Sequence, residues 1–105
     1  MEQEASGLVR LRVNPPDPGQ IHVVDVEGIA VAIANVGGRL RAFDDRCTHR
    51  GCSLSKGTLA GPTVICSCHG GRFDLRSGDV LDEPPTVPIR VRAVSQDGEF
   101  LLIEA

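Results

Sequence analysis

Two short stretches concentrate the reactive side chains of this chain. "CTHRGC" at 47–52 and "CSCHGG" at 66–71 contain all four cysteines and two of the three histidines. Cysteine and histidine side chains bind metals, and two cysteines can also form a disulfide. Such residues seldom gather in two glycine-flanked segments by chance. The two stretches therefore predict a metal site, a disulfide or both.

The rest of the chain consists mainly of short runs that favour β-strands. Several runs alternate apolar and polar residues, which is typical of a strand with one buried face, and no segment has a sustained helical period. We therefore expect an all-β fold, a small antiparallel sandwich or partly open barrel. The expected strands are residues 8–13, 21–26, 29–36, 39–43, 63–66, 89–94 and 99–105.

Length and charge limit the classes of protein to consider. A chain of 105 residues, 41% of them hydrophobic, suits one domain over 1–105. Its net charge of -3 argues against a nucleic-acid partner. No apolar run approaches the roughly 18 residues of a membrane span. Acidic Glu2 and Glu4 stand where a signal peptide would be basic. We therefore expect a cytoplasmic protein without a membrane segment.

The middle of the chain, from about 44 to 81, holds all the cysteines and reads as loops inserted between strands. Zinc is one candidate for these loops, because it takes four thiolate or imidazole ligands. However, zinc pairs usually have two to four residues between ligands, whereas a single residue separates Cys47 from His49. The remaining histidine, His22, lies in an expected strand and is interpreted as an ordinary polar side chain.

"CTHRGCSLSKG" followed by "CSCHGGRFD" resembles the two cluster-binding loops of the Rieske iron–sulfur family, and the resemblance extends over about 39–94. It implies a Rieske-type fold, in which a cluster-binding subdomain of about 44–81 is inserted into the β sandwich. It also implies one [2Fe-2S] cluster with two thiolate and two imidazole ligands. By this resemblance, one iron takes Cys47 and Cys66, and the other takes His49 and His69.

The resemblance also suggests a role for the other two cysteines. In the Rieske proteins of respiratory and photosynthetic cytochrome complexes, cysteines at the positions of Cys52 and Cys68 form a disulfide between the loops. Many dioxygenase ferredoxins lack this pair. A disulfide is therefore expected here, with two free thiols as the alternative. Gly71 and Phe73 stand where the respiratory proteins carry Ser and Tyr donors, so we expect a lower reduction potential than theirs.

The function that the resemblance implies is one-electron transfer rather than enzymatic catalysis. We expect a small monomeric ferredoxin between a flavin-dependent reductase and a terminal oxygenase or other redox protein. One alternative is a Rieske subunit or domain of a larger oxidoreductase, and another is a zinc-binding structural or thiol-sensing module. The "EPPTVP" turn at 83–88 is expected to cover the cluster. A basic rim for docking is expected from Arg46, Arg50, Lys56 and Arg72.

Overall fold

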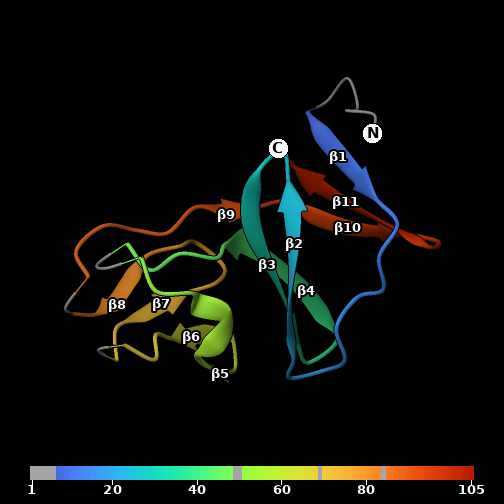
Figure 1. Ribbon diagram of the computed structural model, residues 1–105. Helices are drawn as coiled ribbons and strands as arrows, with labels where there is room; N and C mark the ends of the chain where they lie inside the picture. The colour runs from blue at the N-terminus through green and yellow to red at the C-terminus, as the bar shows by residue number, and fades with distance from the viewer. Residues whose placement is uncertain (1–6, 49–50, 69, 84) are drawn as a thin grey trace.

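The computed structural model describes residues 7–48, 51–68, 70–83 and 85–105. Within these ranges it is all β apart from one short 3-10 turn, η1. The strands form three antiparallel sheets (Figure 1). The all-β, antiparallel fold class expected from the sequence is therefore confirmed. No helix among the described residues is long and apolar enough to cross a membrane.

The outer sheet has the order β1-β11-β10, and the central sheet has the order β2-β3-β4-β9. The strands of the outer sheet are β1 (Leu8–Leu11), β10 (Val94–Asp97) and β11 (Phe100–Glu104). Those of the central sheet are β2 (Ile21–Val26), β3 (Ile29–Val36), β4 (Arg39–Asp44) and β9 (Val91–Arg92).

The third sheet, called the distal sheet below, has the order β5-β6-β7-β8. Its strands are β5 (Thr58–Ala60), β6 (Thr63–Ile65), β7 (Arg72–Asp74) and β8 (Val80–Asp82), and η1 (Leu54–Lys56) precedes them. The sequence predicted only loops over most of this segment, and that part of the prediction was wrong. Strands of three residues are too short to show a clear alternation of apolar and polar positions.

The middle of β3, in the central sheet, is buried on both faces. On β3, Val31 and Ile33 pack into one hydrophobic core with residues of the outer sheet. Ala32 and Ala34 point the other way, into a second core that includes Phe73 of the distal sheet. This two-sided burial explains the almost continuous apolar run of β3, because a strand covered on both faces has no polar side.

The expected strand over 89–94 is divided between two sheets. Val91 and Arg92 pair with β4 in the central sheet, and after Ala93 the chain joins the outer sheet as β10. The buried Arg92 holds this crossing together. Its Nε donates to Asp44 Oδ1 at 2.6 Å, and its Nη1 donates to the carbonyl of Glu104 at 2.8 Å. A guanidinium group thus joins the two sheets at the point where the strand changes partners.

Candidate metal centre

Both cysteine stretches begin immediately or shortly after a strand. The first stretch, 47–52, follows the end of β4, and the second, 66–71, connects β6 to β7. The core beneath both loops contains Cys47 and Cys66 together with Phe43, Leu54 and Phe73. The two thiols are nearly inaccessible, with 3% and 2% exposure. Segments 19 positions apart in the sequence therefore place one buried sulfur each over a common core.

The two loops close with the same pair of backbone hydrogen bonds. In the first loop, the N–H of Cys47 donates to the carbonyl of Cys52, and the N–H of Gly51 donates to the carbonyl of Cys47. In the second loop, the corresponding donations run from Cys66 to Gly71 and from Gly70 to Cys66. All four N···O distances lie between 2.7 and 3.0 Å. The loops therefore have a common backbone framework despite their different sequences.

The fifth residue of each loop is a glycine with positive φ. The angle is 76° at Gly51 and 74° at Gly70. Residues with a Cβ adopt this left-handed conformation at a cost, whereas glycine does not. The glycines that flank the cysteines in the sequence are thus explained by the turn that each loop must make.

A disulfide joins Cys52 to Cys68, with 6.6 Å between their Cα atoms. It ties the last residue of the first loop to the third residue of the second loop. The Sγ atoms of Cys52, Cys66 and Cys68 all lie within 4.8 Å of one another. They do not make a three-thiolate zinc site, because two of the three sulfurs are bonded to each other. The disulfide prediction is confirmed, and the alternative of two free thiols is wrong.

Three residues of the predicted site lie outside the described residues: His49, His69 and Arg50. The assignment of the two histidines as metal ligands therefore stays a prediction. His22 lies on β2 (Ile21–Val26), and its side chain is exposed. That position agrees with its interpretation as a polar surface residue.

Within segment 83–88, of which the structure describes residues 83 and 85–88, Val87 and Pro85 contact the two cysteine loops. Thr48 Oγ1 donates a hydrogen bond of 2.6 Å to the carbonyl of Val87. Pro85 is fully buried, and a Cβ added to Gly71 would lie only 2.5 Å from Pro85 Cδ. The proline segment therefore packs where a side chain at position 71 would otherwise stand. Sequence reasoning singled out the prolines and Gly71 but missed Thr48, a hydroxyl directly after the first cysteine.

A second contact that the sequence did not reveal closes the base of the first loop. The carboxylate of Asp45 accepts hydrogen bonds from the backbone N–H of Ser55 at 2.6 Å and from its hydroxyl at 2.9 Å. Ser55 lies in η1, so the contact joins the chain just before Cys47 to the chain just after Cys52. The signal available in the sequence was a pair of acidic residues directly before the loop.

The expected basic rim is only partly supported. Arg46 and Lys56 are exposed, and the guanidinium group of Arg46 lies close to Gly51. Arg72, however, forms an ion pair with Asp82 at 3.1 Å, with both side chains about half exposed. Its charge is therefore partly neutralised within the chain. Phe73 is fully buried and carries no donor, as its sequence position suggested.

The cysteine and histidine side chains of the two loops suit a metal cluster bound between the loops. Two buried thiols start two loops of the same backbone design, and each loop carries a histidine two or three residues further on. A family model described as the Rieske [2Fe-2S] domain matches residues 10–94. The chain belongs to the Rieske family. Mixed thiolate and imidazole ligation of a [2Fe-2S] cluster defines such centres, so the predicted cofactor, one [2Fe-2S] cluster, is confirmed.

Similar proteins of known name agree with this assignment. The chain is 39% identical over 93 residues to the biphenyl dioxygenase ferredoxin subunit of Pseudomonas sp. strain KKS102. The alignment covers 88% of this chain and 85% of the relative. The ferredoxin of carbazole 1,9a-dioxygenase from Nocardioides aromaticivorans IC177 is similar in structure, with 29% identity and a TM-score of 0.84. That comparison covers 90% of this chain and 96% of the other.

A third comparison is with a complex of reduced oxygenase and oxidized ferredoxin in carbazole 1,9a-dioxygenase. One of its chains is 34% identical to this one, with a TM-score of 0.83 and coverage of 90% and 92%. These Rieske relatives confirm the prediction of a small ferredoxin-type electron carrier rather than an enzyme with its own substrate. They support the iron–sulfur interpretation over the zinc-binding alternative.

Proposed function

We propose that this Rieske protein is the ferredoxin component of an aromatic-ring oxygenase system. It would accept one electron from a flavin-dependent reductase and deliver it to a terminal oxygenase. The observation that carries the proposal is the end-to-end similarity to ferredoxins of dioxygenase systems, whose length this chain matches over 85% or more.

We further propose that Cys47 and Cys66 bind one iron and that His49 and His69 bind the other. The burial of both thiols and the common design of the two loops support this ligand set. When bound, the cluster supplies a group that accepts and releases one electron. Two neutral imidazoles in place of two thiolates make the site less negative, which raises its reduction potential above that of an all-cysteine cluster.

The residues around the site adjust that potential. Gly71 and Phe73 offer no side-chain donors to the sulfurs, so the added electron is stabilised less than in Rieske proteins that carry Ser and Tyr there. We therefore expect a potential below that of the respiratory proteins. Pro85 packs against Gly71, and the disulfide joins the two loops beside the same site.

We also propose that residues 1–105 act as a single Rieske domain, with a cluster-binding subdomain over about 44–81. The strands of the distal sheet follow β4 and precede β9 in the sequence, and they pair with one another in a separate sheet, which supports this division. A monomeric state, a cytoplasmic location and the absence of a nucleic-acid partner stay predictions.

Reconstitution tests the function directly. The purified protein is analysed for iron, acid-labile sulfide and zinc, then mixed with NADH and the reductase and oxygenase of a biphenyl or naphthalene dioxygenase system. We expect about two irons per chain, bleaching of the visible spectrum by the reductase, and oxygenase turnover that depends on this chain. A colourless zinc protein, or a red protein that neither component reduces or oxidises, would contradict the proposal.

The Cys52–Cys68 disulfide favours one alternative, a Rieske subunit of a larger oxidoreductase, because many dioxygenase ferredoxins lack this pair. The two functions differ in assembly. A subunit should co-purify with a stable large partner from the native host, whereas a carrier should elute alone and be reducible alone.

A further inference from the structure

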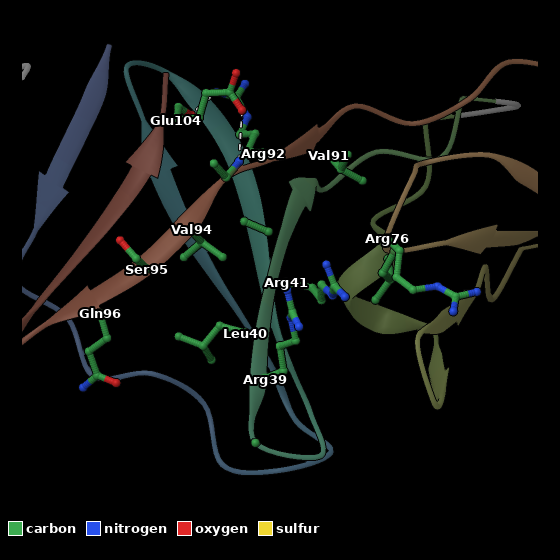
Figure 2. Close-up of a pocket in the computed structure, with 14 residues that line it drawn as sticks. Arg39, Leu40, Arg41, Arg76, Val91, Arg92, Val94, Ser95, Gln96 and Glu104 are labelled. Carbon is green, nitrogen blue, oxygen red and sulfur yellow. Dashed lines mark hydrogen bonds between the residues drawn. The ribbon is translucent and has the colours of Figure 1, made fainter. Parts of the chain in front are cut away.

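A groove opens where the central and outer sheets separate. β4 pairs with β9 only through Ala42 and Phe43, and beyond Ala93 the chain belongs to the outer sheet. The first half of β4 and the strand β10 do not pair, although Leu40 and Val94 pack against the same core, and the groove that these strands line measures about 630 Å³. Figure 2 shows this groove, with Leu40 on one side and Val94, Ser95 and Gln96 on the other.

Both strands present open edges to the groove. The N–H of Asp44 donates to the carbonyl of Arg90 on the β9 side of β4. Backbone groups alternate along a strand, so the N–H and C=O of Leu40 point to that same side. Among the described residues, none pairs with Leu40 there. β10 is also an edge strand, because its only partner in the outer sheet is β11.

Three arginines lie along one wall of the groove. Arg39 and Arg41 are two positions apart on β4 and share one face of the strand, about 7 Å apart along it. In Figure 2 their side chains extend from β4 in the direction of Arg76, which follows β7. Arg76 is paired with Asp74 at 3.0 Å, whereas Arg39 and Arg41 have no ion-pair partner among the described residues.

Two of these arginines lower the pKa of a neighbouring carboxyl group, that of Asp74. Hydrogen bonds from Arg76, with a smaller contribution from the charge of Arg41, hold the pKa of Asp74 below its usual value. The chain as a whole carries a net charge of -3. The groove is therefore a local positive site on an acidic protein, a pattern that selects for negatively charged partners.

We propose that this groove binds an extended, acidic segment of another protein, which adds as a strand to the open edge of β4. Backbone hydrogen bonds to Leu40 would give affinity, and carboxylates at alternate positions of the segment would pair with Arg39 and Arg41. A free anion such as phosphate would use the arginines alone. A strand uses both features of the groove, the charge and the open edge.

The location of the groove gives this contact a separate role from electron transfer. β7 (Arg72–Asp74) begins directly after Gly71, the last residue of the second cysteine loop, and Arg76 lies beyond its opposite end. A segment bound beside Arg76 would thus leave the cysteine loops accessible. The groove could hold a partner protein while the loop end of the molecule contacts an electron donor or acceptor.

A peptide titration tests the proposal on the intact, metal-loaded protein. The probe is a nine-residue peptide of alternating Glu and Val with blocked ends, added to ¹⁵N-labelled protein. The amide signals of Leu40 and Gln96 should shift, and hydrogen exchange at Leu40 should slow at least tenfold. Arg39→Ser and Arg41→Ser should each weaken binding several-fold. Arg12→Ser, the same charge change at an exposed residue that does not line the groove, should not.

A second peptide separates strand addition from simple charge attraction. It has the same sequence with N-methyl groups on its valines, which retain the carboxylates but block strand pairing, and it should bind at least tenfold more weakly. Equal binding of the two peptides, an unchanged Leu40 amide, or the same shifts produced by inorganic phosphate alone would overturn the proposal. So would concentration-dependent dimerisation that accounts for the open edge without any peptide.

Discussion

The two cysteine loops are alike in their backbone and different in how their sixth residue is fixed. Both loops close with the same two hydrogen bonds and turn at a glycine with positive φ. The first loop ends in Cys52, which is covalently joined to the second loop. The second loop ends in Gly71, which packs under Pro85. One loop end is held by a covalent bond and the other by van der Waals contact.

This difference separates the two proposed thiolate ligands from the residues that secure the loops. The shared backbone framework places Cys47 and Cys66 in equivalent, buried positions. Position six is free to differ, because it only ties each loop to a neighbour. The comparison therefore predicts that matching substitutions within the two frameworks change iron content or stability equally. Substitutions at the two loop ends should change stability by different amounts.

Loss of either framework thiol should have the largest effect. Cys47→Ser and Cys66→Ser should both lose nearly all bound iron, because each removes one of the two thiolates proposed to hold the cluster. Cys68→Ser, in the same loop as Cys66, should keep most of it. Iron content and visible absorbance after purification measure the outcome. A Cys66→Ser protein that retains its colour would show that the two loops are not equivalent.

Removal of the disulfide should have the next largest effect. The double variant Cys52→Ser/Cys68→Ser should be less stable than the parent by about 3 kcal/mol, because the unfolded chain regains the freedom of a loop. Urea unfolding of the two metal-loaded proteins measures the difference. An unchanged midpoint would mean that the framework alone holds the loops together.

The substitution Gly71→Ala should destabilise by about 1–3 kcal/mol, because its methyl group would overlap Pro85. The backbone at position 71 does not need a positive φ, so the cost is steric. Adding Pro85→Ala should then recover part of the loss. Thermal unfolding of the single and double variants tests this coupling, and strictly additive effects would rule out the contact as the cause.

The smallest effects should come from the two turn glycines. Gly51→Ala and Gly70→Ala should each cost about 1–2 kcal/mol, the penalty of the left-handed conformation. Among the described residues, nothing obstructs a methyl group at Gly70, and the atoms near a methyl group at Gly51 belong to the flexible side chain of Arg46. The two costs should therefore agree closely. A large difference between them would contradict the shared design of the loops.

The sequence predicted the larger strands because their apolar patterns are long enough to read. The three-residue strands β5, β7 and β8 were missed, since their pairing depends on neighbours in the fold. The burial of β3 on both faces was also missed, because the distal sheet that covers one face was not foreseen. The change of sheet at Ala93 leaves no local signal in the sequence.

In the site, too, contacts between distant segments could not be predicted from the sequence. The disulfide was predicted from the resemblance of the motifs to known Rieske loops, and the structure confirms it. The contacts of Thr48 with Val87 and of Asp45 with Ser55 were not predicted. They join segments 39 and 10 positions apart, and only the folded backbone brings those segments together.

Electron paramagnetic resonance of the dithionite-reduced protein tests the central claim most directly. Ligation by Cys47, His49, Cys66 and His69 predicts a [2Fe-2S] spectrum whose average g lies below that of an all-cysteine cluster. The variants His49→Cys and His69→Cys, if they bind a cluster, should raise the average g. A native spectrum with all-cysteine values, or a reduced protein with no signal and bound zinc, would contradict the account.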